Sequence, residues 1–168
     1  SGGSTGSDGF YDVSATRQKI SNGIVDVKFN AAGWVSHLSV DRHTIPLKEP
    51  CQLCLYPDNA CGVGEAWEIE RSQLNLGRSL ELRGELKVIE QGPVRAVLQG
   101  VCKCGPESLL KIRYILERGL PWLKVEIHAD WREQRKLLRY HIPTAYRAAY
   151  ARYGCPFGSI LRPALPRD

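Results

Sequence analysis

Residues 62–70 combine the side-chain types that can hold a sugar. Three carboxylates and one tryptophan follow a glycine-rich turn, among them Glu65, Trp67 and Glu68. Carboxylates accept hydrogen bonds from hydroxyl groups, and an indole ring covers the apolar C–H face of a pyranose. A plain loop that enters a strand, with Trp67 and Ile69 in the core and the glutamates in solvent, explains the same residues. The residues alone favour this second interpretation, and sugar binding is a hypothesis beside it.

Six cysteines raise the question of a metal site or of disulfides. They are Cys51, Cys54, Cys61, Cys102, Cys104 and Cys155. Cys51 and Cys54 have the spacing of a metal clip, and Cys102 and Cys104 could supply two more thiolates. However, the apolar residues around Cys54 predict a strand, on which positions three apart face opposite sides, whereas a zinc knuckle needs a tight turn. Without a secretion signal, disulfides are not the default. Free thiols are therefore favoured over a structural zinc site and over disulfides.

The histidines and the motif inventory predict no catalytic centre. The four histidines, none with the spacing of metal ligands, are His37, His43, His128 and His141. His128 alternates with apolar residues in a strand-like run, which favours a solvated side chain. The chain has no glycine-rich loop before a helix and no serine in a nucleophile elbow. The residues alone therefore give little support for a catalytic centre or for a histidine metal site.

The charge of the chain is moderately basic. The formal net charge is +5, and lysines and arginines mostly alternate with acidic residues along the sequence. The one dense cluster comprises Arg132, Arg135, Lys136 and Arg139. A nucleic-acid binder needs a contiguous basic face with stacking aromatic residues. A solvated basic surface is favoured, and no nucleic-acid partner is expected.

Length and composition are those of one globular domain. The chain has 168 residues, 43% hydrophobic and 24% charged, with no methionine. The missing methionine and the Gly/Ser-rich start predict a flexible or tag-like leader over 1–12, followed by a single domain over 13–168 that is part of a longer protein. No apolar run approaches the ~20 residues of a membrane span, and no signal peptide is evident. We therefore expect a cytoplasmic location and no membrane partner.

Hydrophobic periodicity predicts strands throughout. In 122–128 the apolar residues alternate with charged ones, and in 111–116 Ile112, Tyr114 and Leu116 are expected to face inward. The same alternation, with Leu80 and Leu82 before Gly84 and Leu86 and Val88 after it, predicts further strand structure. Period-two alternation is typical of half-buried antiparallel strands.

Turn residues separate these runs. The turn at 30–33 joins expected strands at 24–29 and 34–40, with Gly33 at a positive φ. Further turns are expected at 91–93, between strands at 85–90 and 94–102, and at 118–121, between strands at 110–117 and 122–131. The run 131–138 is expected to be strand and bend, not helix. Such spacing predicts an all-β, antiparallel β-sandwich.

Four segments in order resemble the C-terminal β region of family 38 glycoside hydrolases, the α-mannosidases. The first, 22–33, is similar to the hairpin N-G-x-x-x-V-x-F-(N/D)-x-x-G, and the second, 52–69, to N-Q-L-x-L-x-x-D followed by D-A-W-(D/E)-I. The third, 119–138, is similar to W-x-E-x-H-K-x-L-K, and the fourth, 151–163, to (Y/F)-G-x-x-x-R-P-T-H without the final Thr-His. Together they cover nearly the whole chain. The resemblance implies a supersandwich of the galactose-mutarotase type.

The resemblance also implies that this chain contains no catalytic residue, no metal ligand and no cofactor. In that family the zinc ligands and the nucleophilic aspartate lie in an N-terminal domain, to which nothing here corresponds. The chain is then expected to pack on that missing catalytic domain, with Trp67 beside the sugar, Glu65 or Glu68 near it, and mannosides as the ligand. Glu133 and Arg162 are expected in ion pairs, and the uncovered surface predicts a homo-oligomer. The alternative is a free-standing carbohydrate-binding or scaffold module.

Overall fold

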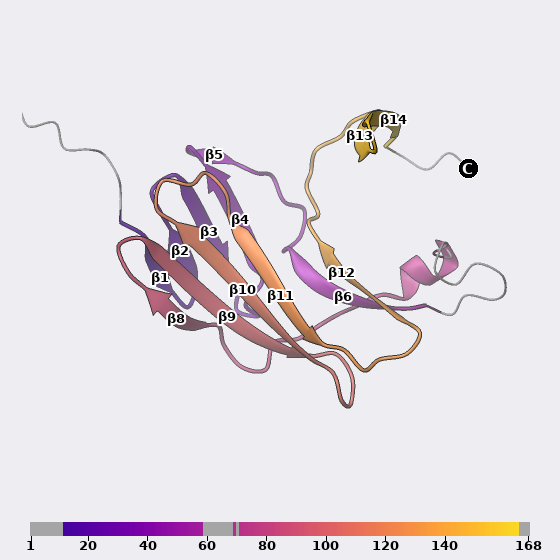
Figure 1. The fold of residues 1–168 in the computed structure, drawn as a ribbon, viewed down its shortest axis with the longest axis horizontal. Coiled ribbons are helices and arrows are strands. Elements are labelled where there is room, and N and C mark those ends of the chain that lie inside the picture. The colour runs from indigo at the N-terminus through magenta and orange to yellow at the C-terminus, as the bar shows by residue number, and fades with distance from the viewer. Residues whose placement is uncertain (1–11, 59–68, 70, 165–168) are drawn as a thin grey trace, which may run out of the picture.

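The chain folds almost entirely into strands. A computed structural model describes residues 12–58, 69 and 71–164 (Figure 1). In order, the elements are β1 (Ser14–Thr16), β2 (Lys19–Ser21), β3 (Val25–Phe29), β4 (Val35–Val40), β5 (His43–Thr44), β6 (Gln52–Pro57), the 3-10 helix η1 (Arg71–Leu76), β7 (Arg78–Ser79), β8 (Lys87–Gln91), β9 (Arg95–Lys103), β10 (Leu109–Glu117), β11 (Lys124–Asp130), β12 (Lys136–His141), β13 (Tyr150–Cys155) and β14 (Gly158–Pro163).

These strands form four antiparallel sheets. A five-stranded sheet has the order β1-β2-β3-β4-β5, and a four-stranded sheet has the order β11-β10-β9-β8. The two share one apolar core and together form the sandwich (Figure 1). A three-stranded sheet, β12-β6-β7, continues from the sandwich, and β13 and β14 form a separate hairpin. The prediction of an all-β antiparallel sandwich is confirmed.

The core lies between the five- and four-stranded sheets. Ile20, Val25 and Val27 contribute from the first sheet, and Ile112 and Tyr114 from the second, all fully buried. The register pairs each strand so that alternate residues point into this layer, as the period-two pattern requires. The inward orientation predicted for the 111–116 run is therefore confirmed.

Two predicted strand segments differ from the structure. Leu80 and Leu86 are buried as expected, but they lie between β7 and β8, and Leu82 forms only an isolated bridge with Cys102. Val88 is 38% exposed, because β8 is an edge strand with a register shift between Val88 and Glu90. The alternation there correctly predicts burial for the two leucines but not regular pairing.

The turns follow the expected chemistry. Gly33 has φ +78° in the β3–β4 turn, and its close approach to Leu82 leaves no room for a side chain. Arg135, with φ +51°, lies in the bend between β11 and β12, so the strand-and-bend prediction for 131–138 is confirmed. Among the described residues, no helix combines the length and the hydropathy needed to cross a membrane.

Asn22 joins the two sheets of the sandwich through its side chain. The residue is 1% exposed, and its Nδ2 donates to the carbonyl oxygens of Glu117 and Leu120 at 2.7 and 2.8 Å. Its Oδ1 accepts from the backbone N–H groups of Ile24 and Val25 at 3.1 and 2.7 Å. One amide thus satisfies four backbone groups and fixes the start of β3 against the β10–β11 turn.

Candidate functional site

The candidate sugar-contacting residues lie on the connection between β6 and β7. Trp67, Glu65 and Glu68 themselves fall outside the described residues. The two ends of their connection are held side by side, because β6 and β7 pair antiparallel with Leu55 opposite Arg78. What the structure defines is therefore the base of this connection, formed by β6, η1 and β7.

Tyr56 and Gly77 pack against each other at the base of the connection between β6 and β7. A side chain at position 77 would collide with the Tyr56 ring, because the ring packs directly on the backbone of Gly77. No side chain larger than hydrogen fits there unless the ring moves. Tyr56 is only 6% exposed although it faces away from the main core. The last strand residues before the connection and the first residue after η1 are thus packed together.

Two residues of β12 hold the Tyr56 ring from a distant part of the sequence. The phenolic oxygen of Tyr56 lies 2.7 Å from Nε2 of His141, and their rings stack with centroids 5.7 Å apart and planes 14° apart. The guanidinium carbon of Arg139 lies 5.6 Å from the Tyr56 centroid, within the range of a cation–π contact. The β6–β12 register places Arg139 opposite Cys54, on the same face as Tyr56.

The electrostatics keep this cluster neutral at the tyrosine and the histidine. Burial and the neighbouring Cys54 raise the pKa of Tyr56, and Arg139 partly opposes them. Burial and Arg139 lower the pKa of His141, against a weaker opposite effect of Glu49. Near pH 7 this hydrogen bond therefore joins an uncharged phenol to an uncharged imidazole. Such a pair holds side chains in place, and we call Tyr56, Gly77, Arg139 and His141 the β6–β12 clamp.

The clamp was not predicted from the sequence. Tyr56 and His141 are separated by 85 positions, and only the antiparallel pairing of β6 with β12 brings them together. The apolar run in 52–57 predicts a strand but does not identify its partner.

The cysteines do not form a metal site in the part of the chain that the structure describes. Cys51, Cys54, Cys102 and Cys104 are buried, Cys155 is exposed, and all five are free thiols. Cys51 belongs to the main core while Cys54 faces Tyr56, which confirms that the pair points to opposite sides of a strand.

The buried thiols are also poor metal ligands electrostatically. Burial, followed by the proximity of Cys104, raises the pKa of Cys102 to about 12, and burial raises the pKa of Cys51 and Cys104. Metals bind thiolates, which these shifts disfavour. No group of three or more His, Cys, Asp or Glu side chains within 12–58, 69 and 71–164 is arranged to hold an ion. Cys61 lies outside these residues.

The other predicted polar residues have surface roles. His128 is exposed and lies 3.6 Å from Glu126, as expected for a solvated strand face. Arg162 places its guanidinium 5.9 Å from the Tyr153 centroid, and Glu133 packs over Gly105. Neither of these contacts is an ion pair. The ion pairs expected for Glu133 and Arg162 therefore stay a prediction.

The outer face of the four-stranded sheet contains a shallow hollow of about 330 Å³. Its rim is charged, and four of the charged side chains form ion pairs: Glu90 with Arg95, and Lys124 with Glu126. A hydrogen bond from Arg95 lowers the pKa of Glu90. Self-paired charges of this kind suit a solvated face, and no aromatic ring lines the hollow.

Comparisons with known proteins identify the family that the four sequence segments resemble. The family described as "Glycosyl hydrolases family 38 C-terminal domain" matches residues 20–168. Human Alpha-mannosidase 2C1 is 25% identical over 148 residues, which are 86% of this chain and 14% of that protein, and the mouse protein of the same name is 24% identical. Alpha-mannosidase G of Dictyostelium discoideum is 34% identical over 110 residues, or 63% of this chain and 10% of that protein. The chain thus spans a small fraction of the relatives it matches.

Proposed function

The chain belongs to family 38 of the glycoside hydrolases, as a C-terminal domain, and we propose that it completes a sugar-cleaving site without supplying its catalytic groups. In this proposal the domain packs on a catalytic domain of an α-mannosidase-like protein. The connection between β6 and β7 then forms part of the rim, with Trp67 against the sugar ring and Glu65 or Glu68 accepting its hydroxyl hydrogen bonds.

The observation that carries the proposal is the β6–β12 clamp at the base of that connection. A rim residue must be held in place if it is to add to substrate binding. Tyr56, packed on Gly77 and hydrogen-bonded to His141, provides such an anchor on a sheet rather than on a loop. The neutral, buried character of the pair supports a positioning role rather than proton transfer.

The zinc that the family implies belongs, in this proposal, outside the chain. The donor set offers no suitable cage, since Cys51 and Cys54 face opposite sides of β6 and burial raises the pKa of Cys51. A zinc ion held by residues outside this chain would supply Lewis-acid stabilisation of charge in the reaction. The residues of this chain act only on the position of the substrate. A cytoplasmic location is part of the same proposal, supported by the free thiols of the five described cysteines.

Hydrolysis of 4-nitrophenyl α-mannoside tests the proposed function. We expect no turnover by the 168-residue chain with added zinc, and turnover by the complete gene product that contains it. In the complete product, Trp67→Ala should raise KM more than it lowers kcat, while Trp122→Ala, at an exposed tryptophan elsewhere on the surface, should change neither. Turnover by the chain alone would contradict the proposal.

The second candidate is a free-standing carbohydrate-binding module. The same clamp favours it, because a fixed base also suits a binding loop. It predicts that the isolated chain binds methyl α-mannoside in a calorimetric titration, and that Trp67→Ala removes the heat of binding. An isolated chain that binds no sugar would eliminate this candidate and leave the first intact.

A further inference from the structure

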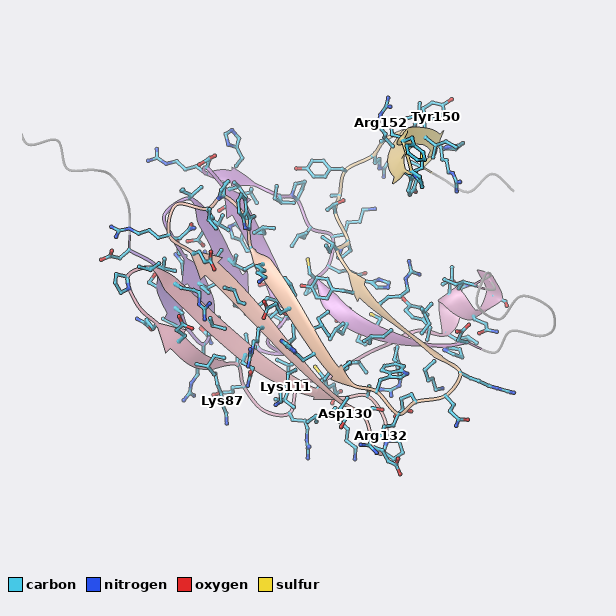
Figure 2. The ribbon with its side chains drawn as sticks, in the orientation of Figure 1. Lys87, Lys111, Asp130, Arg132, Tyr150 and Arg152 are labelled. Carbon is cyan, nitrogen blue, oxygen red and sulfur yellow. The ribbon has the colours of Figure 1, made fainter. Side chains whose placement is uncertain are left out.

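The segment after β12 leaves the body of the molecule. Its last described backbone hydrogen bonds with the body are at 143–145, where Lys48 N–H donates to Pro143 O at 2.8 Å and Ala145 N–H donates to Pro46 O at 2.7 Å. The chain then forms β13 and β14, which pair only with each other (Figure 1). Figure 2 shows Tyr150 and Arg152 on this hairpin, well apart from Lys87 and Lys111 on the sandwich.

The β13–β14 hairpin exposes an apolar and aromatic surface. Every residue of 150–163 is exposed except Ala151, which is half-buried. The exposed large side chains are Tyr150, Tyr153, Phe157, Ile160 and Leu161. Phe157 forms the tip with φ +66°, which directs a bulky ring fully into solvent. An isolated two-stranded hairpin is marginally stable in water, so this surface requires a cover.

The charge of the segment indicates what covers it. Residues 142–164 contain three arginines, Arg147, Arg152 and Arg162, and no acidic residue. None of the described salt bridges involves them. Two such hairpins would repel each other, which disfavours a second copy docked hairpin to hairpin. An apolar groove rimmed by carboxylates would satisfy both the rings and the guanidinium groups.

We propose that the β13–β14 hairpin docks in a carboxylate-rimmed apolar groove on the remaining part of an α-mannosidase-like protein. This inference rests on the proposed function, and it names the surface through which the domain is attached. The chain spans 14% of the human relative, so most of a protein of that kind lies beyond these residues and is available as the partner. The aromatic tip supplies apolar contact, and the arginines set the orientation.

A photo-crosslinker tests the docking surface directly. The complete gene product is expressed with p-benzoylphenylalanine in place of Phe157 and, as a matched control, in place of Ile89, a half-exposed residue on the distant edge strand β8. Irradiation followed by peptide mapping should join position 157, and not position 89, to an acidic, apolar segment outside 1–168. Mixing heavy-isotope and light-isotope chains separates links within one molecule from links between copies.

Reversing the charge of two hairpin arginines tests whether docking requires their positive charge. Arg152→Glu with Arg162→Glu should lower the cross-link yield about tenfold, the equivalent of roughly 1.4 kcal/mol. The double Arg→Lys variant should retain most of the yield, and Lys87→Glu, on β8, should leave it unchanged. Because the hairpin lies outside the core, the melting temperature of the sandwich should be the same in all of these variants.

The possible outcomes separate the two proposals. Links between copies, links to lipid, links to a protein without α-mannosidase similarity, or no links at all would each overturn the docking proposal. A complete product that hydrolyses the mannoside but gives such links would leave the proposed function standing. A complete product that gives the expected links but no hydrolysis would instead overturn the proposed function.

Discussion

The sandwich and the β13–β14 hairpin are built from the same kind of strand, yet they differ in what covers them. Ile112 on β10 is fully buried, whereas Ile160 on β14 is 44% exposed. Strand β10 has a neighbour on each side and a second sheet across the core, while β13 and β14 have only each other. Strand pairing alone therefore does not bury apolar side chains, and a second layer is needed. The sandwich has a closed core, whereas the hairpin presents the uncovered surface for which we propose docking.

The largest difference in the free energy of unfolding is expected between alanine variants of a buried and an exposed isoleucine. Ile112→Ala should reduce the free energy of unfolding by about 4 kcal/mol, because it leaves a cavity in a closed core. Ile160→Ala should change it by less than about 0.5 kcal/mol, because no packing is lost on an exposed hairpin. Urea unfolding of the two variants checks this. Equal losses would mean that the hairpin is part of the cooperative core.

Asn22→Ala tests whether the two sheets of the sandwich are joined by the buried amide. We expect a loss of about 3 kcal/mol, since buried backbone groups lose their partners. Asn30→Ala is the matched control: Asn30 Oδ1 accepts one hydrogen bond, from Trp34 N–H at 2.9 Å, within a turn. Its loss should be about 1 kcal/mol by thermal unfolding. Similar losses in the two variants would remove the joining role of Asn22.

The β6–β12 clamp should make stability depend on pH. Burial lowers the pKa of folded His141 below its ordinary value of 6.5, so the unfolded chain takes up the proton first. The contribution of the neutral His141 to the free energy of unfolding is complete above the ordinary pKa. It is lost as the pH falls through the ordinary pKa toward the lower pKa of the folded state. His141→Gln should flatten the decline in melting temperature between about pH 7 and about pH 5. A decline that is equally steep in His141→Gln and in the wild type would contradict this contribution.

The smallest effect concerns association rather than folding. Light scattering should show the isolated chain as a dimer or larger species, because its hairpin surface is uncovered. Added salt should strengthen this association by screening the arginines. Phe157→Ser combined with Ile160→Ser should shift the chain toward monomer without changing the unfolding midpoint. A wild-type chain that is monomeric at every salt concentration would contradict the expected homo-oligomer.

Much of the fold could be predicted from the sequence because its signals are local. Alternation in 111–116 and glycine at position 33 depend on neighbours a few positions away, and both predictions are confirmed. The irregular path of 80–86 could not be predicted, since buried leucines show the same spacing in a strand and in a loop pressed against a core. The Trp67 region was identified by composition, but its anchor at Tyr56 was not.

What the sequence by itself determined is the strand content, the hairpin turns, the separation of Cys51 from Cys54 and the family resemblance. Each follows from residue type and short-range spacing, which set backbone conformation and the face of a strand. Only the tertiary structure decided that His141 reaches Tyr56, that Asn22 joins the two sheets, and that the β13–β14 hairpin remains uncovered. These three features depend on which distant strands pair and which sheets pack together. The alternation of apolar and polar residues is the same whether or not a second sheet covers the strand.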